Sequence, residues 1–461
     1  MTGMDLEAIR HAVSELHRGR RWIIAADAAA AAHHMVERLL EDEPTGVMIV
    51  AGIEGVGELP DADRLHYTRA SGDTLMGGIR EFLASIEQPS ADLLAAVDAF
   101  DPDGSARVLG QGFSREQRLA GRTVYGRRRL AWRQLEDKIT VDALWDDAGV
   151  SRAPSAVVPV SDARHAAATL GNSAGTVWVA DNRTGWHGGG EYTRWVPPDI
   201  DPEEVEAWFA TRADQVRVMP FLNGLPCSIH GFVTNDGVAV FLPLELFILR
   251  RPQPPGFVYA QGANFWTPPD SVSDDMRAAA RSVGAMLADQ LGYIGGFGID
   301  GVATVDGFRP TELNPRLTLG HMIQGRTADV PLGPMERMML EGDLTVTAHD
   351  LEDHVVDAVS DRRGGGMMFT TTRAAEPAEA WFRFTDEGIA VTNDPDVANG
   401  RMTLGPTTFG SLVQVTLDPE GIPVGPSLAP RAIQLMAMAN DLWNLDLPDV
   451  APAPDLTARD S

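Results

Sequence analysis

Short apolar runs that alternate with helical segments mark the first part of the chain. The runs at 21–26, 46–51 and 64–68 are predicted strands, and an alanine-rich helix that reaches about Leu40 separates the first two. Strands that alternate with helices are typical of parallel sheets. Residues 1–130 are therefore predicted to form a Rossmann-like α/β domain. No Gly-x-Gly-x-x-Gly follows the first strand, so a dinucleotide site is not indicated.

The middle of the chain, residues 131–345, mixes helices with neighbouring strands. Helices are predicted over 138–148 and over 274–290, where apolar residues recur at helical spacing and Ser273 is the expected N-cap. The predicted strands of this part are 156–160, 176–180, 216–222, 228–234, 238–242, 295–305 and 308–313. The last two are joined by Asp306-Gly307, a dipeptide typical of a tight β-hairpin.

A small α+β domain is predicted at 346–448. Its pattern consists of three strand-like segments and one late helix, at 367–371, 380–384, 410–416 and 430–443. Residues 449–461 are rich in Pro, Ala and Asp and are predicted to be a disordered tail. The predicted fold class is thus multidomain, with α/β and α+β units.

The amino-acid composition limits the kinds of partner that this protein is expected to bind. The net charge of −27 would repel nucleic acid and anionic membrane surfaces, so neither partner is expected. The single cysteine, Cys227, allows no intrachain disulfide and is interpreted as a small buried side chain rather than a nucleophile. No signal sequence and no apolar run of membrane-spanning length is visible, so a cytoplasmic location is expected.

The lysine count singles out one residue. Of the 38 basic residues, only Lys138 is a lysine and the others are arginines. Arginine can replace lysine where only a positive surface charge is needed, but a compact ammonium fits a phosphate site that a planar guanidinium does not. Lys138 is therefore a candidate ligand contact, with an unreplaced surface lysine as the alternative.

Three oxygen donors share one face of the predicted hairpin. Glu312 and Asn314 are two residues apart on its second strand, so their side chains point the same way, and the tight turn brings Asp300 beside them. Such hard oxygen ligands suit Mg²⁺. Arg316, two residues further on, adds a fork suited to a carboxylate or a phosphoryl oxygen. The alternative is an exposed polar hairpin face.

Two motifs resemble those of the ATP-grasp superfamily, in particular its biotin carboxylase-like and amino-acid ligase members. The first is Asp137-Lys138 followed by Gly149-Val150 and Pro154, and the second is Asp300 followed by Glu312-Leu-Asn-Pro-Arg316. The resemblance covers about residues 137 to 321. It implies an ATP-grasp fold at 131–345, with the Rossmann-like unit before it as a pre-ATP-grasp domain.

The resemblance also implies roles for individual residues. Lys138 would contact the nucleotide phosphates and act in catalysis together with Arg316, which would hold the substrate carboxylate or the acyl phosphate. Asp300, Glu312 and Asn314 would bind Mg²⁺, or alternatively Mn²⁺, with Glu312 also close to ATP. The remaining ATP contacts would come from the glycine-rich loop and the hinge strand, namely Gly188, Gly189, Gly190, Met219 and Phe221.

The chain departs from the family at the nucleotide base. A second lysine is usual on the strand before the glycine-rich loop, where this chain has Ala180, and Arg183 or Arg194 is a candidate substitute. The hinge strand also lacks the usual glutamate. Further along, Glu245 and Arg251 share one face of a strand and are candidate substrate contacts, with a solvated strand end as the alternative.

These features together predict a ligase that depends on ATP and Mg²⁺. It would activate a carboxylate as an acyl phosphate and then join it to an amine, with a role in antibiotic biosynthesis as a guess. A biotin carboxylase-like carboxylation and a non-catalytic nucleotide-binding module are the alternatives. Small carboxylate and amine substrates are the expected partners, and similar enzymes are often homodimers. His33 and His34 are interpreted as surface residues.

Overall fold

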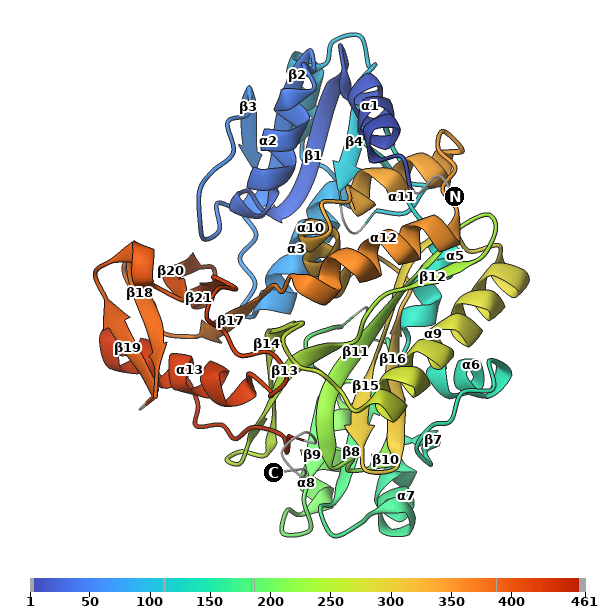
Figure 1. The fold of residues 1–461 in the computed structure, drawn as a ribbon, viewed down its shortest axis with the longest axis vertical. Helices are drawn as coiled ribbons and strands as arrows, with labels where there is room; N and C mark the ends of the chain where they lie inside the picture. Colours follow the sequence, from blue (N-terminus) through green and yellow to red (C-terminus); the bar gives the residue numbers. More distant parts are fainter. Residues whose placement is uncertain (1–3, 111–112, 184, 186, 387, 456–461) are drawn as a thin grey trace.

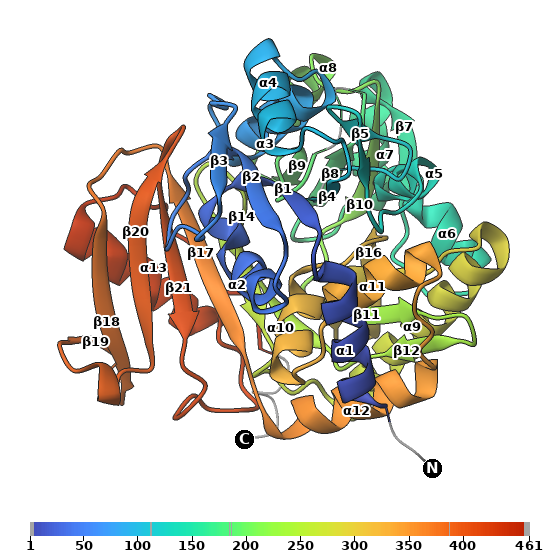
Figure 2. The ribbon, with the colours of Figure 1, turned by 90° about the horizontal axis from the view of Figure 1, so that it is seen from above.

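Three hydrogen-bonded sheets make up the protein in the computed structural model, which describes residues 4–110, 113–183, 185, 187–386 and 388–455. Figure 1 shows the N-terminal sheet at one end of the molecule and the smallest sheet at the other, with the largest sheet between them. Seen from above, the C-terminal strands lie on one side of the N-terminal sheet and the smallest sheet lies on the other (Figure 2). None of the described helices is long and apolar enough to cross a membrane.

The N-terminal sheet has six strands in the order β3-β2-β1-β4-β6-β5. The three strands predicted from the sequence are present as β1 (Arg21–Ala28), β2 (Gly46–Ile53) and β3 (Arg64–Tyr67), and they pair in parallel. The sheet is completed by β4 (Arg107–Gly110), β5 (Arg118–Leu119) and β6 (Arg122–Val124). Four helices accompany it: α1 (Leu6–His17), α2 (His33–Glu41), α3 (Leu75–Glu87) and α4 (Ala91–Phe100). Apolar side chains on both faces of β1 and β2 are buried, as expected for a parallel sheet covered on both sides.

The smallest sheet has the order β7-β10-β8-β9, with β7 (Ala156–Pro159), β8 (Thr176–Ala180), β9 (Thr193–Val196) and β10 (Gln215–Pro220). Helices α7 (Ala163–Leu170) and α8 (Pro202–Ala210) cover it around Trp178 and Phe209, which are both fully buried. The glycine-rich loop joins β8 to β9. The small sheet therefore carries this loop on a separately packed core.

The largest sheet begins with the order β16-β15-β11-β13-β14, and β12 (Val238–Val240) pairs with β11 (Gly224–Val233). The other members are β13 (Leu244–Arg251), β14 (Gly256–Ala263), β15 (Gly295–Thr304) and β16 (Gly307–Asn314). Helix α9 (Asp270–Leu291) packs its apolar side chains against β11, β15 and β16 in one core cluster. The helix starts at Asp270, so the predicted N-cap Ser273 is wrong: Ser273 lies inside the first turn, and its backbone N–H donates to Pro269.

The C-terminal strands continue this sheet through β14 and β17, in the order β17-β21-β20-β18-β19. They are β17 (Gly365–Thr371), β18 (Ala378–Thr385), β19 (Gly388–Thr392), β20 (Gly400–Thr407) and β21 (Gly410–Leu417), with α13 (Ala429–Trp443) packed on them. Two of these strands, β19 and β20, were not predicted, although Met402 and Leu404 alternate with Arg401 and Thr403 along β20. The strands of the C-terminal part, which the sequence pattern predicted to form a separate domain from residue 346 on, thus belong to the same hydrogen-bonded sheet as β14.

Three further helices, α10 (Leu319–Thr327), α11 (Leu332–Glu341) and α12 (Ala348–Asp361), cover the other side of the large sheet. Helix α6 (Val141–Asp147) follows the short helix α5 (Leu130–Arg133) and the 3₁₀ turn Gln134–Glu136. Together they place the segment around Lys138 against β16.

The segment after Pro448 is ordered as far as Asp455, so the prediction of a disordered tail is wrong for 449–455. Ala451 exchanges two backbone hydrogen bonds with Arg250, and the Asp455 carboxylate accepts one from the backbone of Ser427. These contacts satisfy backbone groups at the edge of β13, which explains why a segment of low sequence complexity packs here. The rest of the predicted tail, 456–461, lies outside the described residues.

A buried glutamate joins β13 to the start of α13. The Glu245 carboxylate accepts hydrogen bonds from the Ser427 hydroxyl at 2.5 Å, the Leu428 N–H at 2.8 Å and the Ala429 N–H at 3.3 Å. The last two N–H groups belong to the first turn of a helix, which favours a negative charge. Burial has the larger effect, however, and raises the pKa of Glu245 to about 7.

This shift predicts a dependence of stability on pH. Because the folded-state pKa is raised, the contribution of Glu245 is complete below about pH 4.5 and is lost as the pH rises through about 7, on the order of 3 kcal/mol. We expect Glu245→Gln to remove this component, so the difference in urea midpoint between variant and wild type should change across that window. A difference that stays constant from acid to neutral pH would contradict the assignment.

Candidate active site

A cavity of about 340 Å³ lies between the small and large sheets, a volume within the range of ligand pockets. Its wall is built from β8, β10, β11, β13, β14, β15 and β16, with Met76 of α3 at one side. Most of the residues predicted for the site line this cavity: Lys138, Gly188, Gly189, Gly190, Met219, Phe221, Asp300, Glu312, Asn314 and Arg316. They come from four separate parts of the chain.

The β15–β16 hairpin brings the three oxygen donors together. Asp300 lies opposite Glu312 in the register, and Asn314 lies opposite Gly298, two residues before Asp300. The register shifts after Asp300, where Thr311 donates its hydroxyl to the Asp300 backbone carbonyl at 3.1 Å. The Asn314 amide donates to the Asp300 carboxylate at 3.0 Å. The alternation of side chains along β16 and one β-bulge therefore position Asp300, Glu312 and Asn314 together.

The two carboxylates of this patch oppose each other electrostatically. Burial and the negative charge of Glu312 raise the pKa of Asp300, while a hydrogen bond from the Ser228 hydroxyl, at 2.7 Å, lowers it in part. A divalent cation would relieve this repulsion, and two carboxylates with an amide oxygen are ligands that Mg²⁺ accepts. The donor types therefore suit a magnesium ion once the Asn314 amide turns its oxygen, which here accepts from Arg316 at 3.1 Å, towards the two carboxylates.

Lys138 lies opposite the hairpin. Its ammonium is 2.5 Å from a Glu312 carboxylate oxygen, and the side chain is only 8% exposed. It follows the 3₁₀ turn Gln134–Glu136, and the Thr140 hydroxyl donates to the backbone carbonyl of Asp137, which closes the turn. A lysine paired with a carboxylate in this way can exchange that partner for a phosphate when Glu312 turns to a cation.

The glycine-rich loop covers one side of the cavity. Gly189 and Gly190 have φ angles of 58° and 76°, and no atom lies within 4 Å of the position that a Cβ would take at either residue. The loop is closed by backbone hydrogen bonds from Glu191 to Gly188 and from Thr193 to Gly190, both of 3.0 Å. This leaves bare backbone beside the cavity, as a phosphate-binding loop requires. Trp186, in the same loop, lies outside the described residues.

The hinge side of the cavity is apolar and aromatic. Met219 and Phe221 line it, and the ring of Phe221 packs near Trp195 and Phe257 at centroid distances of 5.0 and 6.3 Å. The Arg250 guanidinium lies 4.9 Å from the centre of the Phe221 ring. This surface offers flat stacking partners, which suit a planar base.

Neither predicted substitute for the second lysine lines the cavity. Arg183 pairs with Asp214 at 3.3 Å, and Arg194 lies over the Trp208 ring at 3.6 Å. Besides Lys138, the wall contains a buried arginine, Arg217, which lies opposite Val179 on the neighbouring strand and is held by Asp142 at 2.7 Å. Sequence reasoning missed it because an arginine within an apolar strand carries no signal of its partner.

Glu245 and Arg251 are on the wrong face of β13 for the predicted substrate contact. Leu246, Ile248 and Arg250 line the cavity, so the alternating residues Glu245 and Arg251 point away from it. Glu245 is occupied by α13, and Arg251 donates to the Pro254 carbonyl at 2.9 Å. Strand alternation was identified correctly, but it could not tell which face meets the cavity.

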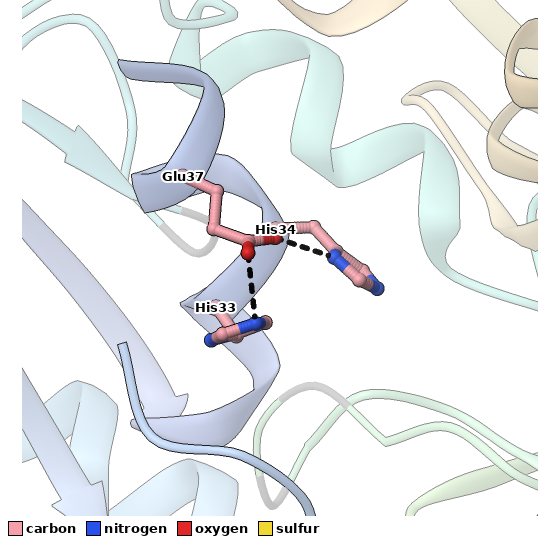
Figure 3. A group of neighbouring side chains, drawn as sticks. All are labelled: His33, His34 and Glu37. Atoms are coloured by element: carbon pink, nitrogen blue, oxygen red, sulfur yellow. Dashed lines mark hydrogen bonds and ion pairs between the residues drawn. The ribbon is translucent and has the colours of Figure 1, made fainter. Parts of the chain in front are cut away.

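His33, His34 and Glu37 form a cluster on α2, far along the chain from the cavity residues (Figure 3). Glu37 is 3.3 Å from His33 Nε2 and 3.1 Å from His34 Nδ1, so one carboxylate pairs with both rings. The Nδ1 atom of His33 is buried without a hydrogen-bond partner. A ligating histidine usually donates its second ring nitrogen to an acceptor, and His33 lacks one among the described residues. The cluster therefore fits a surface ion pair better than a built metal site.

The sequence and the structure were compared with those of known proteins. No protein-family model matches the sequence, and no curated protein matches it. Among solved structures, the biotin carboxylase–β,γ-ATP complex from Campylobacter jejuni is similar with a TM-score of 0.58 and 15% identity, over 95% of this chain and 94% of that one. The L-amino acid ligase from Bacillus licheniformis is similar with a TM-score of 0.50 and 11% identity, over 95% and 100%.

A third similar structure is the pyruvate carboxylase of Rhizobium etli, with a TM-score of 0.56 and 16% identity over 96% of this chain. This chain spans only 38% of the length of that carboxylase. Fold and cavity together define a two-sheet cleft with a glycine-rich loop on one side and an acidic hairpin on the other. The chain has the ATP-grasp fold, as its two motifs predicted.

The glycine-rich loop is tied to the N-terminal part of the chain. Arg80 of α3 forms two hydrogen bonds with the Glu191 carboxylate, at 2.7 and 2.9 Å, directly after Gly190. A bidentate pair of this kind fixes both groups in one geometry. It therefore holds the loop in the position seen here.

We expect Arg80→Ala to loosen this loop. Backbone hydrogen exchange over residues 187–196 should become faster in Arg80→Ala and equally fast in Glu191→Gln, because each change removes the same pair. The double variant should exchange no faster than either single variant. Additive effects, or unchanged exchange, would show that the pair does not hold the loop.

Proposed function

We propose that this protein is an ATP-dependent ligase that activates a carboxylate as an acyl phosphate and joins it to an amine. The observation that carries the proposal is the pairing of Lys138 with Glu312 across one cavity that also contains Asp300 and Asn314. Phosphoryl transfer needs a positive group beside the phosphate oxygens, here Lys138, and acidic groups that can bind a metal ion, here Asp300 and Glu312. The ATP-grasp fold supports the same chemistry, and the acid and the amine are left unspecified.

In the proposed reaction, an oxygen of the substrate carboxylate attacks the γ-phosphorus of ATP and ADP leaves. Lys138 neutralises charge on the transferring oxygens, and the bare backbone of Gly188, Gly189 and Gly190 faces the phosphates. Met219 and Phe221 would contact the base. Arg316 holds the acyl phosphate until the amine attacks its carbonyl carbon and phosphate departs, with the amine proton passing to solvent.

Asp300, Glu312 and Asn314 are the residues that would hold Mg²⁺. A bound magnesium ion supplies charge neutralisation at the phosphate oxygens. The protein contribution is a pair of carboxylates kept close by the hairpin, with the Ser228 hydroxyl bonded to Asp300. Mn²⁺, which has similar ligand preferences, is an alternative ion.

Phosphate release tests the proposal directly. Purified protein with ATP, Mg²⁺ and a pool of carboxylic acids and amines should release phosphate, and Lys138→Ala or Glu312→Ala should lower the rate by about 10³-fold or more. A matched control is Glu379→Ala, which removes an exposed carboxylate that pairs with Arg401 at 3.2 Å, and it should retain the wild-type rate. Full activity of Lys138→Ala would sink the site assignment.

The choice of co-substrate separates this function from two others. Release with acids and amines together, and an amide in the products, supports ligation. Release only with bicarbonate would indicate carboxylation, and nucleotide binding without release under any condition would indicate a binding module.

Metal dependence provides a separate prediction. Chelation of divalent cations should abolish phosphate release, and Asp300→Asn should raise the Mg²⁺ concentration needed for half-maximal rate, because an amide is a weaker ligand than a carboxylate. The measurement is a Mg²⁺ titration of the initial rate at saturating ATP. Identical Mg²⁺ dependence in the variant and the wild type would exclude Asp300 as a ligand.

A further inference from the structure

Arg316 is held from one side by a buried glutamate that the sequence motifs did not single out. Glu136 has a side-chain exposure of 5%, and one of its carboxylate oxygens is 3.3 Å from Arg316 Nε and 2.7 Å from Arg128 Nη1. It ends the 3₁₀ turn that precedes Asp137 and Lys138. The turn that leads to the predicted phosphate-binding lysine therefore also contacts the predicted catalytic arginine.

The charge of Glu136 is secured by its two partners. Burial is the largest single effect and would raise the pKa of Glu136, but Arg128, Arg316 and Arg133 together outweigh it, and the net shift is downward. Arg128 in turn donates to the backbone carbonyl of Pro315 at 2.9 Å, directly before Arg316. Glu136 and Arg128 thus fix both the side chain of Arg316 and the main chain beside it.

This arrangement leaves a defined edge of Arg316 free. Its Nε lies 3.3 Å from the Glu136 carboxylate as an ion pair without a hydrogen bond, its Nη2 donates to the Asn314 amide oxygen at 3.1 Å, and its Nη1 makes only a long contact of 3.4 Å with the Leu317 carbonyl. When Asn314 turns its oxygen to a cation, Nη1 and Nη2 both become available. A guanidinium binds a carboxylate best through two parallel N–H groups.

We propose that Glu136 is a positioning residue that holds the Nε edge of Arg316, so that the Nη1–Nη2 edge faces the acid substrate. The inference rests on the proposed function and adds a residue to it. Glu136 also keeps Arg316 away from competing acids. The Asn314 amide that Arg316 contacts also donates to the Asp300 carboxylate at 3.0 Å, so without Glu136 we expect the guanidinium to turn towards Asp300 and Glu312 and block the cation site.

A double-mutant cycle tests this role. The readout is the formation of hydroxamate from hydroxylamine, whose nitrogen displaces phosphate from the acyl phosphate and so reports acid activation without the native amine. We expect Glu136→Gln to lower kcat/KM for the acid by about 10- to 100-fold, as is typical for a residue that orients an active-site group. The affinity for ADP, measured by calorimetry, should stay unchanged.

The decisive comparison is made in the Arg316→Ala background. If Glu136 acts through Arg316, adding Glu136→Gln to Arg316→Ala should cause no further loss. Added guanidinium ion should restore part of the activity of Arg316→Ala, because it can occupy the place beside Glu136, and this rescue should be lost in the double variant. Additive losses, or rescue that persists in the double variant, would overturn the proposal.

Two further variants separate positioning from stability. Glu136→Asp retains the charge and covers the case in which Glu136→Gln fails to fold, and it should keep more activity than Glu136→Gln. Glu336→Gln is the matched control, since Glu336 is also buried, accepts from the Gly296 backbone at 2.9 Å and forms no hydrogen bond or ion pair with Arg316 in the described part of the chain. It should lower the melting temperature without changing the guanidinium rescue.

Failure of the inference can be told apart from failure of the proposed function. If Arg316→Ala retains full hydroxamate formation, the active-site assignment itself is wrong. If Arg316→Ala keeps only a measurable fraction of the wild-type activity and Glu136→Gln lowers that fraction further, so that the two losses add, the site stands and only the positioning role of Glu136 falls.

Discussion

Repulsion between two carboxylates on one buried hairpin is the constraint around which the site is arranged. Asp300 and Glu312 are opposite each other in the β15–β16 register, and both are half-buried, so water screens their charges only in part. Positively charged side chains from other parts of the chain offset this repulsion. Lys138 pairs with Glu312, and Arg316 lies within electrostatic reach of Asp300. In the proposed function, a divalent cation and a polyphosphate would replace these internal ion pairs.

The short segment 136–138 contributes a residue to each of two ion pairs at the cavity. Glu136 forms an ion pair with Arg316, and Lys138 forms one with Glu312. Two residues of this three-residue segment therefore contact charged groups across the cavity. The segment is itself fixed by the packing of Trp132 and Trp145 in the core below α9. Positions of charged groups in the cavity are thus set by an apolar core rather than by the charges themselves, which is how a buried ionic site keeps a single arrangement.

The similar solved structures share the fold with this chain while differing among themselves in chemistry, since they include carboxylases and an amino acid ligase. A fold of this kind fixes where phosphates and metal would lie, and the substrates are selected by loops and strand ends around it. In this chain the wall beyond Arg316 includes Met76 from α3 and Tyr259 from β14. Two elements outside the hairpin therefore contribute to the cavity wall, and the Arg80–Glu191 pair connects one of them to the glycine-rich loop.

Local sequence patterns determined the parts of the site that depend on one strand or one turn. The period of two along β16 placed Glu312 and Asn314 on one face, the Asp306-Gly307 turn returned Asp300 to them, and the bias against lysine isolated Lys138. Contacts between distant segments were decided only by the tertiary structure. Which face of β13 meets the cavity, the capture of Glu245 by α13, the pairing of Arg217 with Asp142, and the hold of Glu136 on Arg316 all join residues far apart in sequence. Side-chain periodicity specifies a face relative to its own strand, but the partner of that face depends on how the sheets pack, and that information is spread over the whole chain.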